Sequence, residues 1–222
     1  MNNRIMMSQY ERVETFNKDN FKTICDALAK KDPDLQFILN TYNYPPCWKR
    51  TPSFETLVHI ILEQQVSLSS AMAAMKKLKE KTGEITPANL AALSDTELRA
   101  CYFSRQKIIY VKHLACAILK NDLVIEDLSQ MDNDAVRSAL TKIKGIGNWT
   151  ADIYLMMVLQ RSDIFPLGDV ALLTSMRETK KLPKEISKET IATIASAWKP
   201  YQTIAAYILW HSYLCKRKRN IG

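Results

Sequence analysis

Apolar residues recur along most of the chain at the three- and four-residue spacing of helices that bury one face. The stretch that begins at Phe54 shows this spacing at Leu57, Val58, Ile61 and Leu62. The same spacing predicts helices over residues 21–28, 35–39, 69–80, 105–119, 189–198 and 200–214. No segment shows the sustained alternation of apolar and polar residues that is typical of strands. The pattern therefore predicts an all-α fold.

Residues that favour helix ends support this interpretation. Glu97 follows Ser94 by three residues, the spacing of a capping box in which each side chain binds the other residue's backbone amide. Proline stands close to the expected helix starts in Thr51-Pro52-Ser53 and Thr86-Pro87. Glycine follows the expected helix end in Thr82-Gly83.

Two of the five glycines stand one residue apart in the segment Ile143-Lys144-Gly145-Ile146-Gly147-Asn148-Trp149. Helix-compatible sequence lies on both sides, over residues 135–140 and 151–160. Glycine alone adopts positive φ at little steric cost, so the segment predicts a tight hairpin between two helices. The unpaired N–H groups at the start of the second helix would bind a phosphate. The same short run also occurs in ordinary turns, and the motif alone leaves both interpretations open.

Composition and charge narrow the function classes. The 222 residues carry a formal net charge of +8, which favours an anionic partner, nucleic acid first. No apolar run approaches the roughly 20 residues of a membrane span, and the N-terminus does not resemble a secretory signal. We therefore expect an intracellular protein without membrane association, in the cytoplasm or nucleoid of a bacterium or the nucleus of a eukaryote.

The cysteines indicate neither a disulfide framework nor a metal cluster. Five cysteines are scattered along the chain, and none forms a Cys-x-x-Cys pair: Cys25, Cys47, Cys101, Cys116 and Cys215. The odd number and wide spacing predict reduced thiols and argue against zinc and iron–sulfur sites of the clustered type.

Several motifs, taken in order, resemble the helix-hairpin-helix DNA glycosylases, and most closely the 3-methyladenine DNA glycosylase II branch. The resemblance spans about residues 30 to 214. It rests on the hairpin with Trp149-Thr150-Ala151, on Ile61-Leu62-Glu63-Gln64-Gln65-Val66-Ser67, on Ser104-Arg105-Gln106-Lys107, on Phe165-Pro166-Leu167-Gly168-Asp169, and on Trp198-Lys199-Pro200-Tyr201 through Leu209-Trp210.

The resemblance implies two helical lobes with a DNA-binding cleft between them. One lobe would be built from both chain ends, residues 1–50 plus 165–222. The central lobe would comprise residues 51–164 and contain the helix-hairpin-helix at about 135–160. The implied function is flipping alkylated purines, such as 3-methyladenine and 7-methylguanine, out of DNA and hydrolysing their N-glycosidic bond in base excision repair.

The resemblance makes Asp169 the catalytic residue. Breaking the glycosidic bond builds positive charge on the sugar, which a nearby carboxylate stabilises; it can also orient or deprotonate the attacking water. An aspartate directly before an apolar helix is also a favoured N-cap, and one side chain can serve both purposes. Asp152 and Asp163, nearby in sequence, are expected to face solvent.

Trp149 occupies the position where bifunctional relatives carry a lysine nucleophile that cleaves the strand after forming a Schiff base. Tryptophan cannot do this chemistry, so the resemblance implies a monofunctional enzyme without lyase activity. Aromatic faces attract the cationic alkylated purines, and the resemblance assigns the base pocket to Trp149 and Trp210, with a contribution from Tyr154. For Tyr154, a place in the core is the alternative.

Further positions are assigned by the same resemblance. DNA phosphate would contact the hairpin at Gly145 and Gly147, with Lys144 adding positive charge. Arg105 is the candidate for the side chain that fills the hole left by the flipped base, with a solvated charge at a helix start as the alternative.

No cofactor is required by this assignment. A structural Na⁺ or K⁺ is expected on hairpin carbonyls, at Thr141, Ile143 and Ile146. The expected partner is double-stranded DNA that contains alkylated bases, bound by a monomer. Two other functions stay open: the same chemistry on hypoxanthine or another damaged base, and a non-catalytic module that binds damaged DNA.

Overall fold

The computed structural model describes residues 14–217, and the prediction of an all-α fold is confirmed. Within these residues there is no strand, only a single antiparallel bridge between Thr15 and Arg161. The helices are α1 (Lys18–Lys31), α2 (Pro33–Tyr42), α3 (Phe54–Glu63), α4 (Leu68–Thr82), α5 (Pro87–Ala92), α6 (Asp95–Ala100), α7 (Arg105–Leu119), the 3-10 helix η1 (Glu126–Gln130), α8 (Asn133–Thr141), α9 (Asn148–Met157), α10 (Val170–Lys180), α11 (Lys188–Ser196) and α12 (Gln202–Lys216). No helix in this range is both long and apolar enough to cross a bilayer.

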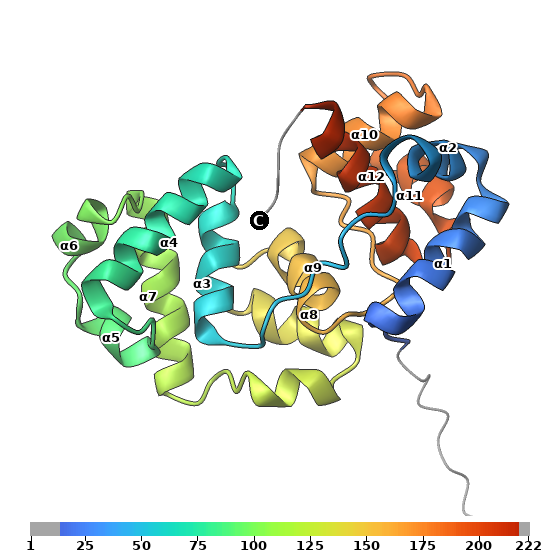
Figure 1. Cartoon of the computed structure of the whole chain (residues 1–222). Helices are drawn as coiled ribbons and strands as arrows, with labels where there is room; N and C mark the ends of the chain where they lie inside the picture. Colours follow the sequence, from blue (N-terminus) through green and yellow to red (C-terminus); the bar gives the residue numbers. More distant parts are fainter. Residues whose placement is uncertain (1–13, 218–222) are drawn as a thin grey trace, which may run out of the picture.

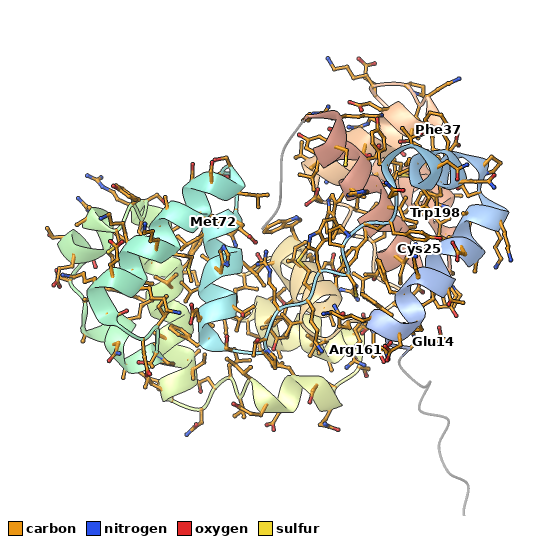
Figure 2. The ribbon with its side chains drawn as sticks, in the orientation of Figure 1. Glu14, Cys25, Phe37, Met72, Arg161 and Trp198 are labelled. Atoms are coloured by element: carbon orange, nitrogen blue, oxygen red, sulfur yellow. The ribbon has the colours of Figure 1, made fainter. Side chains whose placement is uncertain are left out.

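The helices pack in two groups that lie on either side of a central gap between the ribbons (Figure 1). In one group, α12 packs against α10, α2 and α1. In the other, α3 packs against α4, α7 and α9, while α8 packs against α9. We call these groups the terminal lobe and the central lobe. The side chains in Figure 2 fill the interior of both.

Helix α9, in the central lobe, is buried on nearly every side. Eight of its ten residues, Thr150 to Met157, are buried. The loop that follows α9 is held to α12 by Thr203, which donates to the carbonyl of Arg161 at 2.7 Å and accepts from the amide of Ile164 at 3.1 Å. The hairpin helix is therefore tied to both lobes.

The caps expected from the sequence are present. Ser94 and Glu97 form the complete capping box of α6. Ser53, which follows Pro52, caps α3 by accepting from the amide of Thr56 at 3.1 Å. Each such cap binds a backbone donor that the helix itself cannot pair.

Glu63, at the end of α3, has a structural partner that the sequence does not reveal. Its carboxylate accepts two hydrogen bonds from the guanidinium of Arg50, at 2.7 and 2.9 Å. The backbone amide of Arg50 donates to the carbonyl of Met157 at 2.8 Å. The bidentate pair therefore fastens the segment that links the two lobes to α3, and the backbone bond fastens it to α9.

Asp32 anchors the terminal lobe. It is the N-cap of α2, and its carboxylate accepts from the Lys180 ammonium and from Trp198 Nε1, each at 2.7 Å. Burial alone raises the pKa of this carboxyl, but the hydrogen bonds from Lys180 and Trp198 and the Lys180 charge outweigh it. The pKa of Asp32 therefore lies below its ordinary value, and the ionised form is the one that stabilises the fold.

We expect Asp32→Asn to lower the free energy of unfolding by about 2 to 4 kcal/mol at pH 7, because a half-buried ammonium loses the more buried of its two counter-charges. A depressed pKa in the folded state contributes stability above the unfolded-state pKa, and that contribution is lost as pH falls through the folded-state value. The gap between wild type and variant should therefore close below about pH 4 in urea titrations.

Asp34→Asn is the matched control. Asp34 also pairs with Lys180, at 2.9 Å, but its side chain is 46% exposed. The expected loss is under about 1 kcal/mol. Equal losses for the two variants would contradict the role given to Asp32.

Candidate active site

The turn between α8 and α9 has the geometry of the predicted hairpin. Gly145 adopts φ +96°, and the ring of Tyr110 lies where a Cβ atom at Gly145 would be. Ile143 and Ile146 are buried and anchor the turn. Gly147 is the N-cap of α9 and supplies no capping side chain, so the first amides of α9 remain available to an anion.

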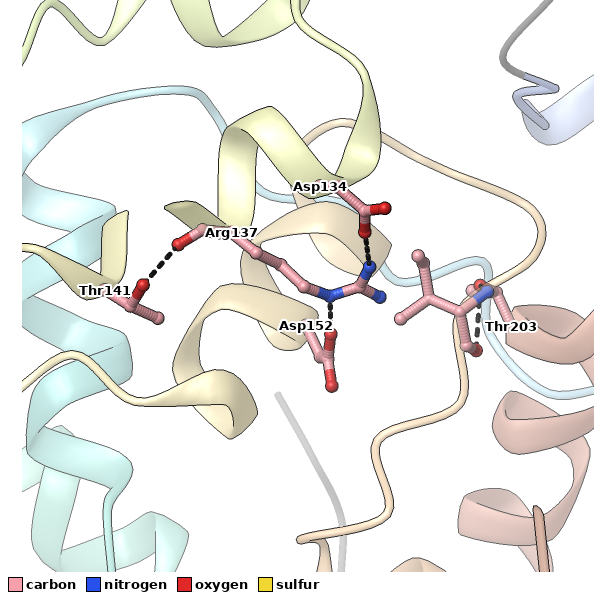
Figure 3. Close-up of polar contacts among 6 residues, drawn as sticks. Asp134, Arg137, Thr141, Asp152 and Thr203 are labelled. Carbon is pink, nitrogen blue, oxygen red and sulfur yellow. Dashed lines mark hydrogen bonds and ion pairs between the residues drawn. The ribbon is translucent and has the colours of Figure 1, made fainter. Parts of the chain in front are cut away.

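An ion pair braces α8 against α9. Arg137 donates from Nε to Asp152 at 2.8 Å and from Nη1 to Asp134 at 3.0 Å (Figure 3). The expectation that Asp152 faces solvent is wrong, because its side chain is only 12% exposed. Burial raises the pKa of Asp152, and the neighbouring Arg137 opposes that rise. The buried charge thus fixes the hairpin helices relative to one another.

Three helices meet at the carboxylate of Asp169. Oδ1 accepts from the Leu172 amide at 2.7 Å and from Trp210 Nε1 at 3.0 Å, and Oδ2 accepts from Trp149 Nε1 at 2.9 Å. Asp169 is therefore the N-cap of α10. Two of its three donors are indoles from α9 and α12, which a cap does not need, so the carboxylate is fixed by more than helix capping.

A cavity of about 810 Å³ opens between the hairpin and the start of α10. Its walls come from the turn after α3, the turn before α7 with the first residues of that helix, the hairpin, and the turn that leads into α10. Asp169, Trp149, Gly145 and Gly147 all line it. The structure thus brings the expected catalytic carboxylate and the expected phosphate-binding glycines to one cavity.

The other two aromatic residues expected in the base pocket lie elsewhere. Trp210 is 6% exposed, packs against Trp48 and Tyr207, and is not part of the cavity wall. It reaches the site only through its hydrogen bond to Asp169. Tyr154 is fully buried, outside the cavity wall, and burial raises its pKa to about 12. Its place in the core is the alternative stated from the sequence, and it does not contact the cavity.

Arg105 and Lys144 are both exposed, and neither lines the cavity. Arg105 is the first residue of α7. The residue that does line the cavity at this turn is Tyr102, which is 64% exposed and adopts φ +67°. Sequence reasoning missed it, although an aromatic residue between two capped helices was the available signal.

Gln64 is the second residue that sequence reasoning left without a role. Its Nε2 donates to the Gly145 carbonyl and to Thr150 Oγ1, both at 2.9 Å. Gln64 also lines the cavity. It therefore links the end of α3 to the hairpin at the cavity wall.

The hairpin carbonyls are compatible with the expected monovalent ion. The carbonyl of Ile143 accepts from the Ile146 amide at 3.0 Å, and a carbonyl oxygen keeps a second lone pair for a cation. Thr141 ends α8, so its carbonyl and that of Ile146 belong to the same turn. Oxygen donors of this kind suit hard cations. The ion stays a prediction.

Comparison with known proteins places this geometry in a family. Residues 58–200 match the model of the HhH-GPD superfamily base excision DNA repair proteins. DNA-3-methyladenine glycosylase of Bacillus subtilis is 29% identical over 209 residues, which cover 89% of this chain and 69% of that protein. DNA-3-methyladenine glycosylase 1 of Schizosaccharomyces pombe is 29% identical over 174 residues, 76% of each chain.

The solved structure of S. pombe 3-methyladenine DNA glycosylase in complex with abasic DNA is also similar. It superimposes with a TM-score of 0.78 at 28% identity, over 85% of this chain and 95% of that one.

The two hairpin glycines should differ in their tolerance of a side chain. We expect Gly145→Ala to lower the free energy of unfolding by more than about 2 kcal/mol, because its φ is positive and Tyr110 fills the space. Nothing lies within 4 Å of a Cβ at Gly147. Gly147→Ala should therefore stay within about 1 kcal/mol of wild type in chemical unfolding. Similar losses for both variants would contradict this account of the turn.

Proposed function

Because the chain belongs to the HhH-GPD superfamily of base excision DNA repair proteins, we propose that it is a monofunctional DNA glycosylase that releases alkylated purines. The observation that carries the proposal is the carboxylate of Asp169, held at the wall of the cavity by Trp149 and Trp210. The reaction is hydrolysis of the N-glycosidic bond, with a free base and an abasic site as products.

Asp169 acts on the sugar and on water. Its position is fixed before substrate arrives, so no reorganisation is needed as positive charge grows on the sugar. Oδ2 accepts one hydrogen bond, from Trp149, and keeps capacity to accept another from a water molecule. That water attacks C1′, gives one proton to the Asp169 carboxylate and leaves a hydroxyl on the sugar, while the departing cationic purine takes the bonding electrons and becomes neutral. An alkylated purine leaves readily because it is already cationic.

The cavity supports a monofunctional reaction. Trp149 offers an aromatic face for a cationic base and has no amine that could attack the sugar. One lysine, Lys107, does line the cavity, and burial lowers its pKa. Its ammonium donates to the carbonyl of Leu62 and so is held at the end of α3. Scoring strand cleavage beside base release tests this assignment directly.

The proposed partner is DNA, and the hairpin is the element that binds its backbone. The free amides at the start of α9 would receive a phosphate, and the exposed Lys144 would add long-range attraction. A monovalent ion on the carbonyls of Thr141, Ile143 and Ile146 would stiffen this turn; it takes no part in bond cleavage. One chain carries the cavity, the hairpin and the carboxylate, so a monomer is sufficient for the reaction.

Tyr102 replaces Arg105 as the residue that fills the gap left by the flipped base. A tyrosine at positive φ is strained, and an exposed ring loses the favourable burial it could have elsewhere. Stacking of the ring between DNA bases contributes about 1 to 3 kcal/mol, which offsets the backbone strain and the lost burial when DNA is bound. Arg105, the first residue of α7, does not line the cavity.

The first test measures base release. We expect wild type to free 3-methyladenine or 7-methylguanine from methylated duplex DNA without cleaving the strand. Asp169→Asn should lower the single-turnover rate by more than about 100-fold, because the charge that stabilises the transition state is lost. An asparagine oxygen still caps α10, so the variant should remain folded.

Asp163→Asn removes the same charge six residues away, at a side chain outside the cavity wall, and should keep the wild-type rate. Release of hypoxanthine alone would indicate a different lesion. Binding of damaged DNA with no base released would identify a non-catalytic module. Strand cleavage that depends on Lys107 would contradict the monofunctional assignment.

The second test separates the ring of Tyr102 from the strain of its backbone. We expect Tyr102→Gly to unfold at the same or a higher denaturant concentration than wild type, because positive φ is inexpensive for glycine. Excision of a paired lesion should fall about tenfold or more, whereas a lesion placed in an unpaired bulge should be less affected. Loss of activity in Arg105→Ala with none in Tyr102→Gly would return the role to Arg105.

A further inference from the structure

On the part of the cavity wall formed by Asp169, Trp149 and Gln64, the side-chain hydrogen-bond donors are already used within the protein, whereas acceptors remain free. The indole N–H of Trp149 is used by Asp169, and the amide hydrogens of Gln64 are used by Gly145 and Thr150. What these side chains retain toward a ligand is acceptor capacity, on the Asp169 carboxylate and on Gln64 Oε1. This wall is therefore suited to a ligand that donates hydrogen bonds and carries positive charge.

The orientation of the Gln64 amide is fixed by its partners. The carbonyl of Gly145 can only accept, so the NH₂ group of Gln64 must face it, at 2.9 Å. The second amide hydrogen meets Thr150 Oγ1, also at 2.9 Å. Rotating the amide would place Oε1 against the Gly145 carbonyl and lose that bond, since two acceptors would then face each other. Oε1 consequently faces away from the hairpin turn.

That oxygen has no donor among residues 14–217, and it is not one of the buried side-chain atoms left without a partner. Gln64 is partly exposed and is one of the residues that line the cavity. Thr150, its partner, directly follows Trp149 in the sequence and lines the same wall. An accessible acceptor of fixed orientation thus lies on the wall that also holds the indole and the carboxylate.

We propose that Gln64 Oε1 accepts a hydrogen bond from an exocyclic amino group of the flipped-out base, and so makes the site selective for purines that carry this amino group over those that lack it. This inference rests on the proposed glycosylase function. An amino group at the matching position satisfies the acceptor. A purine without that amino group leaves the oxygen unpaired, and a carbonyl there sets two acceptors against each other.

Gln64 also supports the hairpin, and the two roles predict different outcomes. Losing the tether to Gly145 and Thr150 disturbs the cavity wall for every substrate, which lowers all excision rates together. Losing the acceptor penalises only substrates that carry the amino group. The ratio of rates for two bases that differ only in that group is therefore the informative measurement.

Two pairs of ligands cover the two amino positions of the natural purines. Duplexes with 7-methylguanine or 7-methylhypoxanthine differ only in the 2-amino group, and their bases can be released. Duplexes with 3-deaza-3-methyladenine or 3-deaza-3-methylhypoxanthine differ at position 6, and these non-cleavable analogues are compared by binding affinity. Neither comparison depends on how a Gln64 substitution affects folding, because both members of a pair are measured with the same protein variant.

We expect wild type to prefer the amino member of at least one pair by about tenfold, the effect of one satisfied hydrogen bond. Gln64→Met has similar length and replaces the amide oxygen by a sulfur that accepts hydrogen bonds only weakly, and it should bring that ratio to within about twofold of unity. Thr150→Val is the matched control: it removes one of the two tethers, keeps Gln64 and its oxygen, and should keep the ratio even if both rates fall.

Three results would overturn the proposal. A wild-type enzyme without preference in either pair, or Gln64→Met with an unchanged ratio, would refute the role of Gln64 while the glycosylase function stands. Failure to release either 7-methylated base, together with equal binding of the analogues, would refute it along with the proposed function.

Discussion

The structure depends most on one carboxylate that joins three helices. The Asp169 carboxylate accepts hydrogen bonds from the Leu172 amide in the first turn of α10, from the indole of Trp149 on α9 and from the indole of Trp210 on α12. A carboxylate withdrawn from water is costly unless donors replace the lost solvation. Three donors do so here, but only while the central and terminal lobes keep their relative position. The site thus exists only when both lobes are correctly docked.

These three hydrogen bonds explain why helix capping and the proposed catalysis fall on one residue, Asp169. The N-terminus of a helix carries partial positive charge, which favours an anion beside it. A cap alone needs one backbone bond, and the two indole bonds fix the remaining freedom of the side chain. Trp210 is consequently a positioning residue: it is buried against Trp48 and Tyr207 and reaches substrate chemistry only through the carboxylate. Trp149 makes the same bond and also lines the cavity.

Sequence patterns predicted the features that depend on neighbouring residues and missed those that depend on contacts between residues distant in the sequence. The capping box at Ser94 and the hairpin glycines depend on neighbours within a few residues, and the structure has both. Tyr154 was harder to place, because α9 is buried almost all round and its pattern marks no outward face. The positive φ of Tyr102 leaves no mark in a sequence, and no local pattern couples Gln64 to Gly145 across 81 residues.

The same network that fixes the carboxylate also shapes what the cavity can recognise. The indole hydrogen of Trp149 and the amide hydrogens of Gln64 hold Asp169 and the hairpin and are no longer available to the ligand, so these side chains offer it only acceptors beside an aromatic face. Such a wall favours cationic, donor-bearing bases before any contact is optimised for them. Selectivity and catalysis are therefore coupled at Trp149: a substitution that frees its indole hydrogen changes both the position of the carboxylate and the hydrogen bonds that the cavity offers a base.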